Sequence, residues 1–201
     1  MRRFLVLVTT SLFSLHAMAA EGEPCHSFAE STIGGVLKVF HDTGTAEAKK
    51  REQLSVIFGQ AVDTDWIGKF VLGQYWRSAS DEEKKAFLEA YRDYITNTYV
   101  SKFKDENGMN VDAIKVVSFG ASNQGSGKYQ VKTIVENKGD EDVHVDYLID
   151  DAGGKCKVHD ITVEGVSLLS SQRSEFASLA STGGVKAVIA AMQKRNLAAA
   201  K

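Results

Sequence analysis

The fold of this chain is decided by residues 129–150, which read YQVKTIVENKGDEDVHVDYLID. On both sides of residues 137–140, apolar and polar side chains alternate with a period of two. This alternation is typical of antiparallel strands that bury one face and expose the other, and the short polar segment between them is typical of a hairpin turn. The expected inward residues are Tyr129, Val131, Thr133, Val135, Val143, Val145, Tyr147 and Ile149.

Two further strands are expected beside this hairpin, and helices at both ends of the chain. Residues 111–117 and 156–163 are rich in β-branched residues, and a glycine-containing turn precedes the second of them. Apolar residues at three- and four-residue steps predict helices over the segments 25–41, 45–59, 66–72, 81–103, 166–179 and 184–197. Ser80 followed by Glu83 predicts a capping box.

Helices followed by strands followed by helices indicate an α+β fold. We expect an antiparallel, strongly twisted sheet of about four strands, with helices packed on one face around an apolar pocket. Residues 20–201 should form a single domain.

The first 19 residues have the layout of a signal peptide. Arg2 and Arg3 precede an uncharged apolar run that closes on Ala17-Met18-Ala19. Cleavage after Ala19 would remove both arginines and take the formal net charge from −2 to −4. We expect an exported, soluble protein, with a retained membrane anchor as the alternative.

Cys25 and Cys156 are the only cysteines in the chain. Export to an oxidising compartment favours a disulfide between them. A zinc site built from Cys25, His26, Cys156 and His159 is the alternative, but adjacent residues rarely bind one metal ion and the spacing matches no usual zinc module.

The sequence contains no recognisable catalytic arrangement. There is no Gly-x-Ser-x-Gly, no Cys-x-x-Cys and no glycine-rich phosphate loop. His159 and Asp160 are neighbours on an expected strand, so their side chains should point to opposite faces. The small negative charge also argues against a nucleic-acid partner. We therefore expect no enzyme, no metal and no cofactor.

Two stretches carry a family resemblance. Residues 70–80 read FVLGQYWRSAS and lead into the capped helix, while residues 159–167 read HDITVEGVS and lead into a segment containing QRSEF at 172–176 and GGV at 183–185. In this order, across about residues 56–195, the chain resembles the MlaC or toluene-tolerance family, the periplasmic phospholipid carriers of Gram-negative bacteria.

The resemblance implies a deep apolar pocket that takes acyl chains and leaves the headgroup at its mouth. It also implies a shuttle between an outer-membrane lipoprotein–porin complex and an inner-membrane ABC transporter with a substrate-binding ring subunit, which maintains outer-membrane asymmetry. Phospholipid would be the ligand, and the protein would be a periplasmic monomer. The cysteine pair departs from familiar members, and a subgroup associated with hopanoids makes those lipids an alternative ligand.

The candidate pocket residues are those expected to face inward from strands and helices: Val71, Leu72, Phe87, Tyr91, Tyr94, Val131, Val135, Val145, Tyr147, Val163 and Val166. The same spacing is typical of an ordinary core. Two other classes of protein also fit the fold. A hydratase or isomerase with a cone-shaped pocket would need a buried His or Asp in that pocket, and a chaperone would expose a large apolar patch.

Overall fold

The computed structural model describes residues 23–100, 115–123, 127–136, 141–151 and 154–199. The expected signal peptide at 1–19, the helix end at 101–103 and the strand start at 111–114 therefore lie outside the described residues. Within those residues, no helix combines the length and the apolar character that a membrane span requires.

The sheet is an antiparallel meander in the order β1-β2-β3-β4-β5. Its strands are β1 (Lys115–Asn123), β2 (Lys128–Glu136), β3 (Val143–Asp151), β4 (Cys156–Val163) and β5 (Val166–Ser167). In one cross-strand row Val131 pairs with Tyr147 and Tyr147 with Ile161. The predicted α+β class and the four long strands are confirmed.

The prediction of a helix beginning at Val166 is wrong, because Val166–Ser167 forms the short strand β5. Glu164 and Gly165 both have positive φ angles, of 47° and 79°. Two such residues form the tight turn that twists in the same sense as the strands it joins. The chain therefore returns along β4 for two residues before the helix begins.

Six helices are described: α1 (Glu23–His41), α2 (Glu47–Ala61), α3 (Thr64–Leu72), α4 (Gln74–Ser78), α5 (Asp81–Val100) and α6 (Leu168–Ala199). The capping box is confirmed, since the backbone N–H of Glu83 donates to Oγ of Ser80 at 3.2 Å and that of Ser80 donates to Oε2 of Glu83 at 3.0 Å. Helix α6 is interrupted at Gly183 and Gly184, whose φ angles are −145° and 62°. The two closing helices predicted from the sequence are thus two segments joined at a kink.

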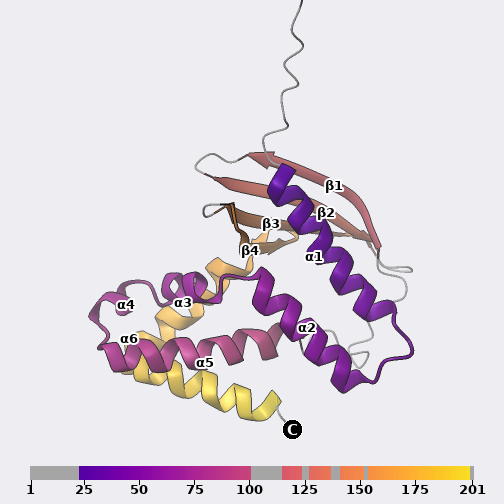
Figure 1. Cartoon of the computed structure of the whole chain (residues 1–201). Coiled ribbons are helices and arrows are strands. Elements are labelled where there is room, and N and C mark those ends of the chain that lie inside the picture. Colours follow the sequence, from indigo (N-terminus) through magenta and orange to yellow (C-terminus); the bar gives the residue numbers. More distant parts are fainter. Residues whose placement is uncertain (1–22, 101–114, 124–126, 137–140, 152–153, 200–201) are drawn as a thin grey trace, which may run out of the picture.

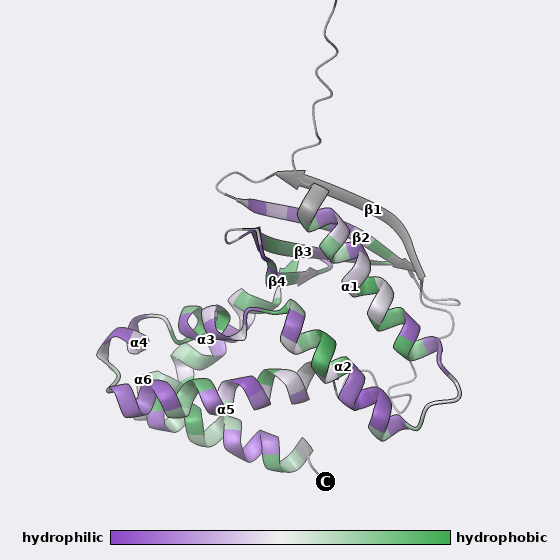
Figure 2. Ribbon diagram, in the orientation of Figure 1, coloured by the Kyte–Doolittle hydropathy of each residue, from purple (hydrophilic) through white to green (hydrophobic). Residues whose placement is uncertain are grey.

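The helices lie on one side of the sheet (Figure 1). Helix α1 crosses the sheet, and α3, α5 and α6 form a further layer below it. Polar and apolar residues alternate along β3 and β4, whereas the start of α2 is strongly polar (Figure 2). The main core joins both layers: Val131 and Ile149 of the sheet belong to the same cluster as Phe87, Tyr91 and Phe176 of the helices.

A second, smaller hydrophobic cluster lies between α1 and α2. It contains Val39, Phe40 and Leu54, with Val36 and Ile57 packed against them. It is separate from the main core. The α1–α2 pair is therefore partly held together by its own packing.

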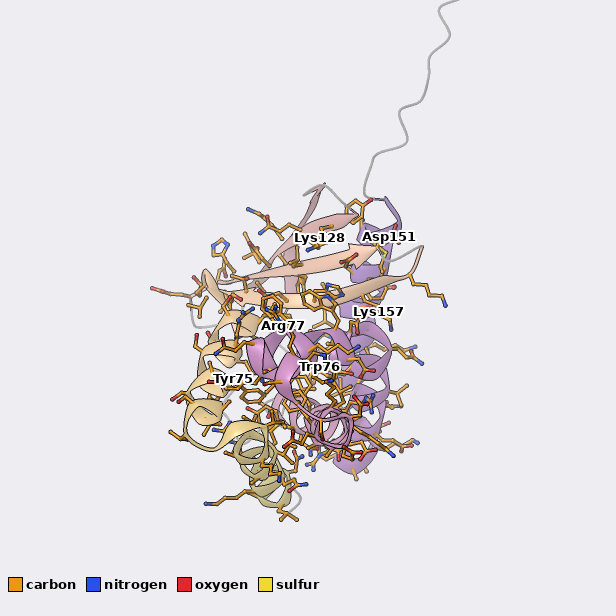
Figure 3. The ribbon with its side chains drawn as sticks, turned by 90° about the vertical axis from the view of Figure 1, so that its left-hand side faces the viewer. Tyr75, Trp76, Arg77, Lys128, Asp151 and Lys157 are labelled. Atoms are coloured by element: carbon orange, nitrogen blue, oxygen red, sulfur yellow. A yellow bond between two sulfur atoms is a disulfide. The ribbon has the colours of Figure 1, made fainter. Side chains whose placement is uncertain are left out.

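A disulfide joins Cys25 in the first turn of α1 to Cys156 at the start of β4. The two Cα atoms are 5.5 Å apart and both side chains are buried. The neighbouring Lys157 donates a hydrogen bond from Nζ to the carbonyl oxygen of Gln60 in α2, where the sheet meets the helices (Figure 3). The pairing predicted from the sequence is present, and both sulfurs are consumed by it, which excludes them as zinc thiolates.

Thiol titration of unreduced, denatured protein tests this disulfide. The expected result is no free thiol, with two appearing only after reduction, because both cysteines are in the bond. Two titratable thiols before reduction would contradict it.

Close packing of α3 on α5 predicts a strong effect at Gly68. A Cβ atom there would lie 3.0 Å from Cδ1 of Tyr91 and 3.1 Å from Cδ2 of Leu88, and Tyr91 is fully buried. Gly68→Val should lower the free energy of unfolding by about 1–3 kcal/mol through overpacking. Gly59→Val is the matched control, since a Cβ at Gly59 meets no atom within 4 Å, and its effect should stay within about 0.5 kcal/mol. Equal effects in denaturant titrations would contradict the close approach.

Candidate functional site

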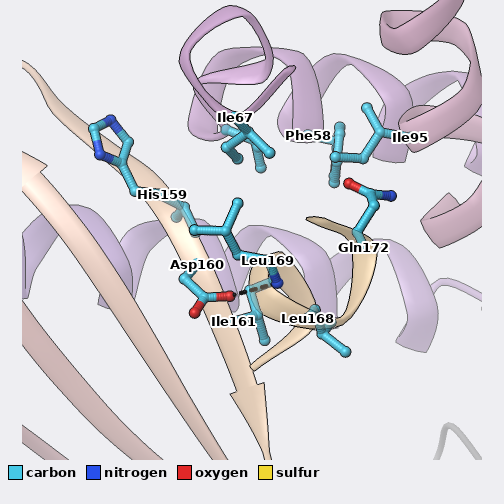
Figure 4. A pocket seen from close by; sticks show the side chains of 11 residues that line it. Phe58, Ile67, Ile95, His159, Asp160, Ile161, Leu168, Leu169 and Gln172 are labelled. Atoms are coloured by element: carbon cyan, nitrogen blue, oxygen red, sulfur yellow. Dashed lines mark hydrogen bonds between the residues drawn. The ribbon is translucent and has the colours of Figure 1, made fainter. Parts of the chain in front are cut away.

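A cavity of about 30 Å³ lies where β4 meets the helices (Figure 4). Its walls come from α2, α3, β4, α5 and α6, and most of its lining side chains are apolar. They are Phe58, Val62, Ile67, Ile95, Val158, His159, Asp160, Ile161, Leu168, Leu169 and Gln172. Three of these residues, His159, Asp160 and Gln172, carry polar side chains. The chemistry of the site depends on which partners these three side chains have.

Gln172 is 8% exposed and already has a buried partner. The hydroxyl of Tyr91 donates a hydrogen bond to Oε1 of Gln172. Tyr91 itself stacks on Phe87 with ring centroids 5.6 Å apart. This pair links α5 to α6 beside the cavity and satisfies polar atoms that would otherwise be costly to bury.

Asp160 is committed to the start of α6. Its Oδ2 accepts a hydrogen bond from the hydroxyl of Ser167 at 2.6 Å, and its Oδ1 accepts one from the backbone N–H of Leu169 at 3.0 Å (Figure 4). The hydroxyl oxygen of Ser167 in turn accepts from the N–H of Ser170 at 3.0 Å. These bonds satisfy N–H groups at a helix N-terminus, where a carboxylate is also favoured by the helix dipole. The stretch at 159–167 thus contains a helix cap and not an acid–base pair.

His159 lies at an irregularity of β4. Its neighbour Asp160 pairs with Leu148 and Val158 pairs with Ile149, so His159 is the extra residue of a bulge. The bulge makes both Val158 and His159 buried on a strand whose side chains otherwise alternate. In Figure 4 the ring of His159 points away from the other labelled lining side chains.

The imidazole is held between two carboxylates and an indole. Nε2 lies 3.5 Å from Oδ2 of Asp63, and Nδ1 lies 3.4 Å from Oδ2 of Asp150. The ring stacks on Trp66 with centroids 4.0 Å apart and planes inclined by 10°. Burial lowers the pKa of His159, while the charges of Asp150 and Asp63 act in the opposite direction. The neutral ring is therefore favoured by its surroundings.

None of the eleven residues proposed from the sequence lines the described cavity. Six of them are buried in the main core: Val71, Leu72, Phe87, Tyr91, Tyr94 and Val131. Val145, Tyr147 and Val163 are half-buried on the sheet, and Val166 is 57% exposed on β5. The side chain of Val135 lies outside the described part of the structure. Whether these residues contact a ligand stays a prediction.

An apolar strip runs from the cavity along the inner face of the sheet. Ile161 lines the cavity and pairs with Tyr147, and the next row pairs Val145 with Val163. All four side chains are half-buried. Burial raises the pKa of the Tyr147 phenol, and a hydrogen bond with Thr133 acts against that rise. Cavity and strip together form the candidate site.

Some of the cavity residues that the sequence analysis did not select lie in recognisable sequence patterns. Ile161 alternates with the polar residues of its strand, and Leu168 and Leu169 directly follow the stretch at 159–167. Ile95 belongs to the apolar face of the capped helix. Nothing in the linear pattern shows that these residues meet at one point.

The sequence model of the MlaC protein family matches residues 30–194. The chain belongs to the MlaC family. The match includes both stretches that carried the resemblance and all the lining residues of the cavity. It confirms the family expected from the sequence.

A solved structure of similar fold is that of a phospholipid-binding protein from Ralstonia solanacearum in complex with a phospholipid. The similarity has a TM-score of 0.70 at 19% sequence identity and covers 88% of this chain and 98% of the other. At this identity the likeness shows a shared fold. The MlaC chain described above therefore has the architecture of a known lipid-bound protein over most of its length.

The setting of His159 predicts how stability depends on pH in this MlaC protein. The pKa of the folded His159 imidazole is lowered from the ordinary value of 6.5. As the pH falls, the unfolded chain therefore binds a proton at His159 before the folded chain does. The free energy of unfolding is thus higher above the ordinary pKa of histidine and decreases as the pH falls below it. His159→Gln and His159→Phe should both weaken the decline of unfolding free energy between about pH 7 and pH 5. His159→Phe also retains an aromatic ring over Trp66, which separates loss of the proton site from loss of the stack. Denaturant titrations with unchanged pH dependence in both variants would contradict the assignment.

Proposed function

We propose that this protein is a periplasmic carrier that binds phospholipid by its acyl chains and moves it between the outer and inner membranes. Residues 1–19 would export it, and its transport would maintain the lipid asymmetry of the outer membrane. The observation that carries the proposal is an apolar cavity, continuous with an apolar strip of the sheet, in a chain of the MlaC family. The phospholipid bound by the Ralstonia solanacearum protein of similar fold supports the same ligand class.

The physical task of such a carrier is to replace the apolar environment of the bilayer. A two-chain phospholipid buries about 30 methylene and methyl groups, each contributing about 0.8 kcal/mol on transfer from water. Desorption into water therefore costs on the order of 20 kcal/mol, which makes unaided transfer slow. An enclosing apolar surface removes this barrier without acid, base or metal chemistry.

The polar residues at the cavity support binding in preference to catalysis. Asp160 caps α6, Gln172 accepts from Tyr91, and His159 is turned toward Asp63 and Asp150. A hydratase or isomerase would need a free acid or base facing the ligand. Among the described lining residues, Asp160 and Gln172 are hydrogen-bonded to other residues, and the ring of His159, whose buried Nδ1 has no hydrogen-bond partner, is stacked on Trp66 between Asp63 and Asp150.

The cavity is small in this structure, at about 30 Å³, whereas ligand pockets are typically about 300–1,000 Å³. Acyl chains would have to widen the space between the sheet and the helices. The half-buried side chains of Val145, Tyr147 and Val163 lie on that route and would become the wall of the widened pocket. In this way, the three sheet residues that the sequence analysis placed in the pocket would contact lipid.

The proposed partners follow from the family. They are an inner-membrane ABC transporter with a substrate-binding ring subunit and an outer-membrane lipoprotein–porin complex, each meeting a monomer of this protein. Hopanoids are the alternative ligand, since an apolar cavity selects by shape and volume more than by headgroup.

Organic extraction of the purified protein followed by mass spectrometry tests the ligand class directly. The proposal expects phospholipid in an amount comparable to the protein. Hopanoid in place of phospholipid would support the alternative ligand. A protein that carries no lipid and takes up none from phosphatidylglycerol vesicles would overturn the carrier proposal.

Replacing Val145 by Trp tests whether the strip contacts acyl chains. If the strip is a pocket wall, Val145→Trp should fill space that lipid uses, so co-purified phospholipid should fall while the thermal midpoint stays near that of lipid-stripped wild type. Stripping is needed because bound lipid raises the apparent stability of wild type. Val56→Trp, at a 53% exposed position of α2, is the matched control and should change neither quantity.

The opposite pattern would show that Val145 belongs to a packed core. In that case Val145→Trp would cost about 1–3 kcal/mol through overpacking. The midpoint would then fall by several degrees while wild-type amounts of phospholipid remained bound.

A further inference from the structure

The stretch at 70–80, which carries part of the family resemblance, contributes no residue to the lining of the described cavity. It forms the end of α3, the turn at Gly73 and helix α4. Arg173 of α6, which belongs to the second resembling segment at 172–176, lies against it. Two segments that are far apart in the sequence therefore meet at a surface that the proposed function does not use.

The turn between α3 and α4 depends on Gly73. Its φ and ψ angles are 57° and −123°, a combination that residues with a Cβ atom rarely adopt. Two hydrogen bonds of 3.2 Å stabilise the turn: the N–H of Gly73 donates to the carbonyl oxygen of Lys69, and the N–H of Trp76 donates to that of Gly73. The turn brings the half-buried indole of Trp76 back to α3, where Nζ of Lys69 lies 5.8 Å from the ring centroid.

The guanidinium of Arg173 is held in place by contacts with α3 and with the turn. Its Cζ lies 4.7 Å from the centroid of the Phe70 ring, which is a cation–π contact. A Cβ atom on Gly73 would lie 3.5 Å from Nη2 of Arg173, so the guanidinium lies directly against the glycine. Phe70 stacks on Trp66 with centroids 5.2 Å apart, and Trp66 stacks on the buried ring of His159. Because the guanidinium is already fixed by these contacts, it loses less conformational entropy when it binds a partner.

Three cations on this surface have no carboxylate partner among the described residues. The side chains of Lys69, Arg77 and Arg173 are exposed, and none forms an ion pair within the part of the chain that the structure describes. In Figure 3, Arg77 lies with its neighbour Trp76 on the face turned toward the viewer. An unpaired guanidinium can bind a carboxylate through two parallel hydrogen bonds.

The composition of the surface favours a protein partner over a membrane. Segments that bind anionic lipid by charge alone usually carry about four to eight cations, whereas this surface has three unpaired ones, and Lys84 beside Trp76 is paired with Asp81 at 3.4 Å. The large apolar side chains that are exposed in the described part of the chain lie elsewhere, in α2, in β5 and at the far end of α6. Arginine beside aromatic rings is instead typical of the residues that dominate protein–protein interfaces.

We infer that the surface formed by Lys69, Phe70, Trp76, Arg77 and Arg173 docks an acidic segment of a partner protein. Carboxylates of that segment bind Arg173 and Arg77, and its apolar atoms pack against Trp76. Arg173 is the anchor of this docking surface, because its contact with Phe70 fixes the guanidinium before the partner arrives. None of the five residues lines the described cavity, so docking and lipid binding use different parts of the molecule.

NMR titration of the full chain with an octaglutamate peptide, blocked at both ends, tests the docking surface. The peptide should shift the resonances of the Trp76 indole N–H and the Arg173 Nε–H, and its binding should weaken as salt is added because the contacts are ionic. Arg173→Ala should weaken binding by about tenfold. Arg173→Lys keeps the charge but loses the planar, stacked guanidinium, so it should also weaken binding.

Arg51→Ala is the matched control and should leave the affinity for octaglutamate unchanged. Arg51 is an exposed arginine of α2 without an ion pair among the described residues. The start of α2 and helix α4 lie at opposite ends of the helical layer (Figure 1). Shifts spread over the exposed lysines and arginines of every element, or equal weakening by Arg51→Ala, would overturn the docking surface.

Phosphatidylglycerol vesicles are the second probe, and they distinguish a membrane from a protein partner. Wild type should not sediment with these vesicles. Sedimentation that Arg173→Ala abolishes would assign the surface to a membrane and would overturn the inference.

The phospholipid content of Arg173→Ala separates docking from lipid binding. The variant should carry wild-type amounts of phospholipid, because Arg173 does not line the described cavity. Loss of phospholipid from the folded variant would make Arg173 a contact of the lipid and would overturn its role as docking anchor. If wild type itself carries no phospholipid, the proposed function is wrong, and the peptide titration alone decides the docking surface.

Discussion

The attachment of the helices to residues 156–159 of β4 is the constraint on which the rest of the structure depends. This segment holds α1 by a disulfide, the end of α2 by backbone and side-chain hydrogen bonds, and the start of α3 through His159 and Asp63. The bulge at His159 makes this possible, because it buries two successive residues against the helices. A regular strand would have turned one of them to the opposite face.

Strand β4 contributes residues to both the cavity and the apolar strip of the candidate site. Val158 and Ile161 line the cavity, and between them in the strand Asp160 fixes the first turn of α6 through Ser167 and Leu169. Residues 159–167, which carry part of the family resemblance, therefore connect the sheet to α6. The apolar cavity lies beside this connection. The polar side chains of Asp160 and Gln172 bind the elements that surround the apolar cavity to one another.

Local sequence patterns predicted most of the elements, because each pattern reports an interaction within a few residues. Alternation identified β2, β3 and β4, the reciprocal bonds of Ser80 and Glu83 marked the start of α5, and Gly183 with Gly184 marked the kink in α6. The short elements α4 and β5 escaped prediction, as did the bulge at His159, since each depends on tertiary contacts. The cavity was also missed, because it lies where residues from five elements meet. Facing inward, as Phe87 and Tyr91 do, does not distinguish a core position from a ligand contact.

The central claim is that acyl chains occupy the space beside β3 and β4 on the inner face of the sheet. Photolabelling with a phosphatidylglycerol that carries a photoreactive group at the end of one acyl chain tests it most directly, with the labelled positions mapped by peptide mass spectrometry. The account predicts labels on Val145, Tyr147, Ile161 or Val163. Labels confined to the exposed surface, such as His144 on the same strand or the helix α4, would contradict it.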